Sequence, residues 1–283
     1  MISQEQLILA YKQACDIDVQ AFKPGNVSVY NDGHDMTVGD FTVSAEVSAY
    51  PITNSDYSLG EKIYYAVKAT REAVGCNTNL GIILLCAPLI EAAYQQQKGQ
   101  SLRNASKKVL ENTSVEDAEW VFKAITLAAP GGLGESKEQD VNDAPAVSLV
   151  QAMKIASQKD RIAMQLITNY KDIYDFSILR YNSELVRFGK QEWAAVSVFA
   201  GLLRKYPDSH IERKYGTKYS GWVLEQIIPV DDALLNTDEP EQLIPMLHEV
   251  DRRFKAESIN PGTTADLTVA TVLVYLMEAF SVR

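Results

Sequence analysis

The sequence contains few of the residues on which redox and zinc chemistry depend. Its 283 residues include three cysteines and three histidines, with no Cys-x-x-Cys and no His-Glu-x-x-His motif. An odd, scattered set of cysteines excludes a disulfide framework and a zinc knuckle, so we expect a protein of the reducing cytoplasm. A Gly-x-Ser-x-Gly elbow is also missing, and the cysteines lie in apolar helical surroundings. Nucleophilic catalysis is therefore not indicated.

Positive charge and long apolar runs are scarce as well. The 27 basic residues are outnumbered by 37 acidic ones, and the net charge of -10 excludes a general nucleic-acid binder, which needs a basic face. The longest apolar stretches, residues 82–90 and 267–277, are too short to span a bilayer, and no charged-then-apolar signal opens the chain. We expect buried core helices and no membrane partner.

What the chain does contain is apolar residues at helical spacing, while alternating strand patterns are missing. We predict an all-α protein, a single-domain orthogonal helical bundle of about a dozen helices that spans residues 1–283. The predicted helices cover residues 3–21, 39–50, 59–74, 79–97, 102–111, 115–128, 143–157, 160–169, 183–206, 219–227, 240–257 and 264–281.

The breaks between these helices carry the unusual residues. Three contain Pro-Gly, and the first, Lys23-Pro24-Gly25-Asn26, forms a tight turn because proline fixes φ and glycine permits φ > 0. Such a turn can either cradle an anion or be an ordinary surface turn with a solvated lysine. If helix ends gather on one side of the bundle, the loops near residues 23–28, 76–79, 129–134 and 260–264 converge on one site.

Two polar segments suggest metal and acid–base chemistry. Asp35 is a candidate Mg²⁺ ligand and its neighbour His34 a candidate acid or base, although a solvated loop explains them equally well. Gly131 and Gly132 precede Asp140 in a segment that could close over phosphates or simply follow a helix C-cap. It lacks the Gly-Lys-[Ser/Thr] ending of a P-loop. With so few histidines, acidic oxygens must bind any metal, which favours Mg²⁺ over Zn²⁺.

The remaining candidates lie at helix ends. Residues 208–216 place an imidazole and the cations Arg213 and Lys214 in a short stretch, which fits either a phosphate pocket or a solvated helix end. Asp160 is most simply an N-cap, whereas Asp172 is a further candidate metal ligand. Asn79 can cap the helix that follows it, which leaves Asn77 free to reach a ligand.

Taken in order, these segments resemble the triphosphoribosyl-dephospho-CoA synthase family, all-helical enzymes that make the prosthetic-group precursor of citrate lyase and malonate decarboxylase. The similarity runs from about Lys23 to Leu276. It rests on residues 23–27, on His34-Asp35-Met36 with Phe41 and Ser44, on 77–81, on 131–134 with Asp140-Val141, and on 260–267.

The resemblance implies transfer of the 5-triphosphoribosyl group of ATP to the 2′-hydroxyl of 3′-dephospho-CoA, with release of adenine and with Mg²⁺ as cofactor. The expected partners are these small nucleotides, and the oligomeric state stays open. The implied catalytic residues are His34, Asp35 and Asp140, and the implied metal ligands are Asp35, Asp140 and Asp172. The implied substrate-binding residues are Lys23, Gly25, Asn26, Ser44, Asn77, Asn79, Gly131, Gly132, Arg213, Lys214 and Asp266.

The chain departs from the family pattern at three places, and at one of them it has Pro261-Gly262-Thr263-Thr264 where members usually have Ser-Pro-Gly-Gly-Ser. Members that act in citrate lyase maturation typically have His-Lys-Asp-Met and Asn-Thr-His-Lys-Gly, whereas this chain has His34-Asp35-Met36 and residues 77–81 as Asn-Thr-Asn-Leu-Gly. Two cations suited to a triphosphate are therefore missing. Two alternatives follow: a divergent ribosyl or phosphoribosyl transferase in the biosynthesis of another cofactor, such as a one-carbon carrier, and a nucleotide-binding protein without catalysis.

Overall fold

The computed structural model describes residues 2–33, 36–130, 140–141 and 143–281, and this part of the chain is all-α, as predicted. Its extended pairing is limited to two isolated bridges, Ser28 with Asn31 and Gly33 with Met36. The α-helices are α1 (Gln4–Gln20), α2 (Val38–Thr53), α3 (Leu59–Val74), α4 (Leu80–Gln95), α5 (Leu102–Glu111), α6 (Val115–Ala128), α7 (Leu149–Ala156), α8 (Arg161–Ile167), α9 (Ile178–Phe188), α10 (Gln191–Lys205), α11 (Ser209–Tyr215), α12 (Ser220–Leu235), α13 (Ile244–Ala256) and α14 (Gly262–Ser281). Short π and 3₁₀ turns are η1 (Ile173–Ser177), η2 (Gly216–Tyr219) and η3 (Pro240–Leu243).

Local capping explains where many helices begin. Ser3, Thr37, Ser58 and Ser114 each accept a hydrogen bond from a backbone N–H in the first turn, and in each case the third helical residue bonds back to the cap. These reciprocal bonds satisfy N–H groups that a helix start leaves open. The helices predicted at 59–74, 102–111 and 115–128 have these bounds in the structure.

Other predicted boundaries are wrong. The helix expected at 183–206 is two helices, because Gly189, at φ +68°, ends α9 before α10 starts at Gln191. The helix expected to end at 227 continues to Leu235 through Pro229, whose ring is exposed, so the missing N–H bond falls on the solvent side. The helix expected from 143 starts only at Leu149, and α11 was not predicted as a helix.

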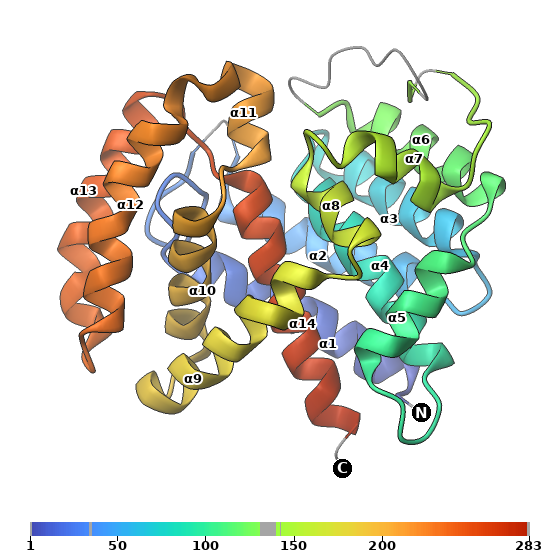
Figure 1. Cartoon of the computed structure of the whole chain (residues 1–283), viewed down its shortest axis with the longest axis horizontal. Helices are drawn as coiled ribbons and strands as arrows, with labels where there is room; N and C mark the ends of the chain where they lie inside the picture. Colours follow the sequence, from blue (N-terminus) through green and yellow to red (C-terminus); the bar gives the residue numbers. More distant parts are fainter. Residues whose placement is uncertain (1, 34–35, 131–139, 142, 282–283) are drawn as a thin grey trace.

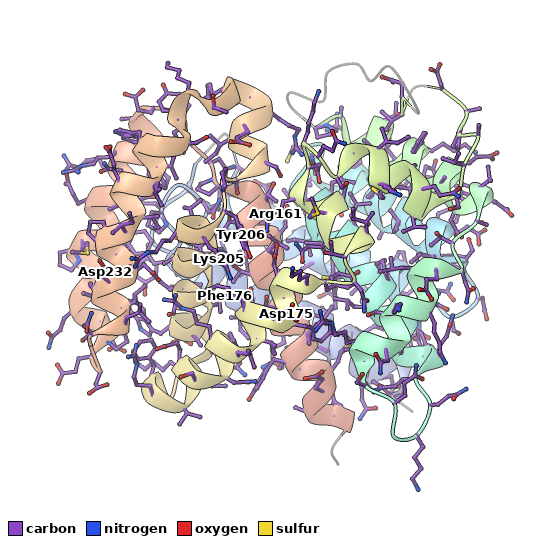
Figure 2. All side chains as sticks on the ribbon, viewed as in Figure 1. Arg161, Asp175, Phe176, Lys205, Tyr206 and Asp232 are labelled. Carbon is purple, nitrogen blue, oxygen red and sulfur yellow. The ribbon has the colours of Figure 1, made fainter. Side chains whose placement is uncertain are left out.

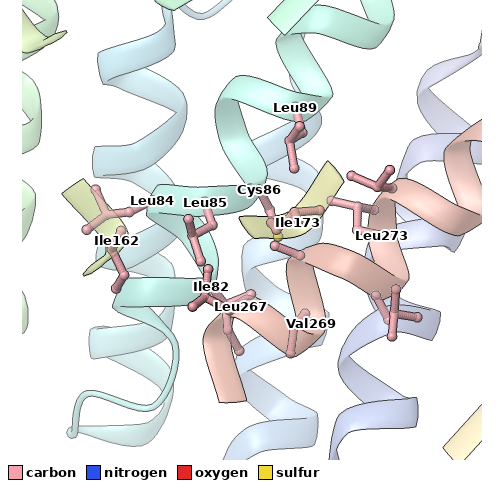
Figure 3. Packing of buried hydrophobic residues seen from close by; sticks show 14 of the residues in the cluster. Ile82, Leu84, Leu85, Cys86, Leu89, Ile162, Ile173, Leu267, Val269 and Leu273 are labelled. Atoms are coloured by element: carbon pink, nitrogen blue, oxygen red, sulfur yellow. The ribbon is translucent and has the colours of Figure 1, made fainter. Parts of the chain in front are cut away.

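The longest helix, α14, runs through the centre of the molecule (Figure 1) and packs against α1, α4, α9 and α10. Helices α2 to α8 lie on one side of it and α10 to α13 on the other. Its contact with α4 is apolar, with Ile82, Leu85 and Cys86 facing Leu267 and Leu273 (Figure 3). Burial of each large apolar side chain contributes about 1.5–3 kcal/mol, so this seam is a major part of the core.

Helix α14 is also the one described helix that is long and apolar enough to cross a membrane, over Gly262–Phe280. However, 72% of its most apolar window is buried inside the protein, as expected for a core helix. Burial likewise raises the pKa of the Cys15 and Cys86 thiols, which keeps both protonated and unreactive.

Candidate functional site

A large pocket of about 760 Å³ opens between the two groups of helices. It is lined by residues from the turn after α1, the start of α4, the end of α6, the α7–α8 junction, α11 and the start of α14. All four loops that the sequence predicted to converge contribute to this lining. The size is that of a site for a nucleotide-sized ligand.

The first polar element of the pocket is the turn after α1. Gly25, at φ +86°, donates its backbone N–H to Asp251 Oδ1 at 2.8 Å. A Cβ at this glycine would lie 2.8 Å from the backbone oxygen of Ile259, so only glycine fits. The turn thereby holds Asn26 against Asn260, to which Asn26 Nδ2 donates at 2.5 Å. Asn26 Oδ1 is buried and accepts no hydrogen bond from the described residues, so a ligand donor could satisfy it.

Two aspartates form the polar floor. Asp18, near the end of α1, pairs with the Lys23 ammonium at 2.7 Å, and Lys23 also donates to the Asp18 backbone oxygen. Burial raises the pKa of Asp18, and the lysine opposes this rise. Asp266, in the first turn of α14, lies over Gly81, where its Cγ is 2.5 Å from the position a Cβ would take. Burial, reinforced by Asp18 and Asp208, raises the pKa of Asp266 well above its usual range.

On one side of the pocket, hydrogen bonds to Asp208 connect the starts of α11 and α14. Asp208 accepts hydrogen bonds from the backbone of His210 and Ile211 with one carboxylate oxygen, and from the backbone and hydroxyl of Thr264 with the other. These charge-assisted bonds tie the two helix starts together. They place His210 and Arg213 in the pocket lining.

Arg213 reaches across the pocket to α8. It forms an ion pair with Asp160, which also caps α8 by accepting the Ala163 N–H at 2.9 Å. The N-cap role predicted for Asp160 is therefore present. Nearby, the Arg161 guanidinium lies 3.4 Å from the ring centre of Tyr206, a contact that joins α8 to the end of α10 (Figure 2).

The opposite wall is apolar. It is built from the facing sides of α4, α6, α7 and α8, and its members include Ile82, Leu84, Phe122, Ile125, Ala152, Met153, Ile155 and Ile162. Most of these side chains are part of the hydrophobic core, so the wall is held by packing on its far side. The pocket thus has one polar and one apolar face, which suits a ligand with a flat base and a charged sugar phosphate.

The predicted site residues separate into four groups. Asn26, Asn77, Asp140, Arg213 and Asp266 line the pocket. His34, Asp35, Gly131 and Gly132 lie outside the described residues. Gly25, Lys23, Ser44 and Asn79 shape the site from behind, since Ser44 accepts a hydrogen bond from Thr78 and Asn79 donates to Ser48. The capping prediction for Asn79 is wrong, because its side chain makes no cap hydrogen bond and Asn77 Oδ1 accepts the Leu80 N–H instead. Lys214 and Asp172 are not among the lining residues.

The last two residues have other surroundings. Lys214 is exposed, with its ammonium 5.0 Å from the Tyr215 ring centre. Asp172 is buried and accepts hydrogen bonds from Arg161 Nε at 2.8 Å and Gln165 Nε2 at 2.5 Å. Both donors bind the same oxygen, Oδ2, and the Arg161 guanidinium forms an ion pair with it, so this carboxylate is already neutralised by a cation.

Four titratable lining residues were not among the predicted site residues: Asp18, Lys159, Asp160, which was predicted only as an N-cap, and His210. His210 stands within a segment that the sequence did mark, three residues before Arg213. Asp18 and Lys159 carry no such signal, since each is one polar residue near a helix end.

The fold and the pocket define a helical protein with a nucleotide-sized site between helix ends. A model of the family described as ATP:dephospho-CoA triphosphoribosyl transferase matches residues 4–282. The chain therefore belongs to the ATP:dephospho-CoA triphosphoribosyl transferase family, and it is an enzyme of the transferase class.

A solved structure has the same fold. It is a protein from Archaeoglobus fulgidus described as a candidate triphosphoribosyl-dephospho-CoA synthase, with a TM-score of 0.61 and 23% sequence identity over 85% of this chain and 98% of that chain. A search of curated proteins gave no significant match.

Proposed function

We propose that this enzyme transfers the 5-triphosphoribosyl group of ATP to 3′-dephospho-CoA, with Mg²⁺, and releases adenine. The observation that carries the proposal is the two-faced pocket, formed by loops that carry the family motifs. Membership of the family supports it, as does the description of the Archaeoglobus fulgidus protein.

The pocket suggests how the donor lies. The apolar wall with Phe122 and Ile125 suits the base, and the unsatisfied oxygen of Asn26 suits a ribose hydroxyl. Arg213 and Lys159 are the cations of the described lining, and we assign both to phosphates. Holding the reacting carbon and the acceptor hydroxyl together is the main contribution expected of such a site.

Magnesium fits this site as a companion of the substrate. Among the described residues, no group of three or more His, Cys, Asp or Glu side chains is arranged to hold a metal. Mg²⁺ usually binds one or two carboxylates together with substrate phosphates, so a preformed cage is not needed. We assign Asp140 to this role, with Asp35 as its second candidate. Bound there, the ion would neutralise phosphate charge.

A second candidate differs in the donor. The described lining holds the three carboxylates Asp18, Asp140 and Asp160 and the carboxyl group of Asp266, against the two cations Lys159 and Arg213. This balance favours a donor with fewer phosphates than ATP, or a different acceptor, in the biosynthesis of another cofactor.

Incubation of the purified protein with Mg²⁺, 3′-dephospho-CoA and ATP, ADP or AMP tests both candidates. We expect adenine by chromatography together with the matching mass gain on the acceptor. Asp140→Asn should lower turnover about 10²- to 10⁴-fold. The exposed neighbour Asp143→Asn is the matched control and should not. Adenine release from none of the donors, with nucleotide binding still measurable by calorimetry, would favour a binding protein.

A further inference from the structure

Asp266 differs from the other acidic residues around the pocket. It lines the pocket in the first turn of α14, and no described residue donates a hydrogen bond to its carboxyl group. Gly81 leaves the space in which this carboxyl lies, because a side chain there would collide with Asp266 and with Ile162 Cδ1, 2.8 Å from the Cβ position. The group is therefore held at the pocket floor by shape, with its oxygens available to a ligand.

The charges that face Asp266 are mostly negative. Asp18 on α1, Asp208 before α11 and Asp160 before α8 all disfavour its ionised form. Each of these three has its own donors: Lys23 for Asp18, the backbone of α11 and Thr264 for Asp208, and Arg213 with the Ala163 N–H for Asp160.

The positive and neutral groups do not reverse this balance. Arg213 is the cation that favours ionised Asp266, and it is already paired with Asp160. Lys159 and His210 line the same pocket, and the thiols of Cys15 and Cys86 face Asp266 from α1 and α4, where burial keeps them neutral. A carboxyl group with no donor among the described residues, next to three carboxylates that have donors, is the one that retains its proton near neutral pH.

We propose that Asp266 is the general acid that protonates the leaving base. This step rests on the proposed function. The bond between C1′ and N9 of the donor breaks, and its electron pair goes to the base, which takes the Asp266 proton at N7. The acceptor hydroxyl bonds to C1′ and releases its proton to water, and the Asp266 carboxylate regains a proton from water. A neutral carboxylic acid is suited to this work because the departing base gains charge as the bond lengthens.

Asp266→Asn tests the assignment, because asparagine has nearly the same shape and cannot release a proton. We expect turnover with ATP to fall about 10²- to 10⁴-fold. With a donor that carries 4-nitrophenolate in place of adenine, whose departure needs no proton, we expect a loss of less than about tenfold. Asp16→Asn, a change of an exposed aspartate on α1, is the matched control and should leave both rates unchanged. An equal loss with both donors, or no loss with ATP, would overturn the assignment.

Infrared difference spectroscopy tests the protonation state of Asp266 without a measurement of turnover. The wild-type protein should show the carbonyl band of a protonated carboxyl group at pH 7, and Asp266→Asn should lack it. Absence of the band in the wild type would overturn the proposal. If the band is present and the wild type uses neither donor, the proposed transfer has failed although Asp266 is protonated, so the two failures are distinguishable.

Discussion

At the scale of single residues, the pocket depends on which acidic groups have partners. Lys23, which the turn motif suggested as a phosphate ligand, is fully buried and holds Asp18 instead. Its charge therefore acts on the pocket floor through another residue. Asp266 has no such partner in the part of the chain that the structure describes, and this difference distinguishes the two aspartates although they line one cavity.

The pH dependence of stability should reveal Asp266. Because its folded pKa is raised, the folded state holds a proton that the unfolded chain releases above about pH 4, so the free energy of unfolding falls as pH increases from there until Asp266 ionises. The slope is about 1.4 kcal/mol per pH unit at most. Asp266→Asn should lack this contribution. Urea unfolding of both proteins from pH 4 to 8 measures it; parallel curves would contradict the raised pKa.

The sequence predicted residues of the pocket where backbone geometry marks them. Asn26 follows a Pro-Gly turn and Asn77 precedes a helix start, so both could be identified. Asp18 could not, because its partner Lys23 lies across the end of α1, and the sequence does not show on which side of the turn the lysine folds back.

At the scale of elements, close approach of helices fixes the frame behind the site. Helices α3 and α6 meet at Gly60, where a Cβ would lie 2.7 Å from Asp117 Cα and 2.8 Å from its backbone oxygen. The Gly60 N–H donates to Asp117 Oδ1 at 2.9 Å. Asp117 also caps α6 through the Ser114 capping box, so one carboxylate serves both helices.

Gly60→Ala should lower the free energy of unfolding by about 1–3 kcal/mol, because the helices must move apart to admit the methyl group. Gly221→Ala in α12 is the matched control: nothing lies within 4 Å of its Cβ position, and alanine favours a helix by about 1 kcal/mol. Thermal unfolding of both variants tests the contrast. Equal melting temperatures for the two variants would show that α3 and α6 can move apart to admit the methyl group without a loss of stability.

Helix boundaries could be predicted where a capping residue marks the helix start. The predictions were wrong where backbone conformation or tertiary packing determines where a helix ends. The starts of α3 and α6 follow from the N-caps Ser58 and Ser114. The break between α9 and α10 was missed because apolar spacing continues across Gly189, and only the left-handed backbone there turns the chain. The helix expected to end at residue 227 continues past Pro229, because the buried Val230 and Leu234 keep it in place.

At the scale of the whole molecule, the pocket joins two groups of helices around α14, so a ligand that fills it should stabilise the entire fold. At a concentration 100-fold above its Kd, a nucleotide that binds only the folded state adds about 2.7 kcal/mol to the free energy of unfolding. We expect thermal shifts with ATP and Mg²⁺ and with 3′-dephospho-CoA. No shift with any nucleotide would contradict a nucleotide site here.

Lys159→Met should weaken nucleotide binding up to about fivefold, since an exposed cation contributes at most about 1 kcal/mol to such a contact. The effect should shrink at high salt. Lys154→Met changes another exposed lysine, on α7, that does not line the pocket, and it should bind normally. Calorimetry at two salt concentrations compares the three proteins, and equal affinities would remove Lys159 from the site.

The position of the pocket floor has a consequence for motion. Thr263, Thr264 and Leu267, in the first turns of α14, are each no more than 4% exposed, and the same helix continues as the centre of the core. Amide protons there should exchange with solvent only when the whole protein unfolds. We therefore expect the pocket floor to keep its position when a nucleotide binds, so that the residues of the pocket walls make any adjustment that binding requires.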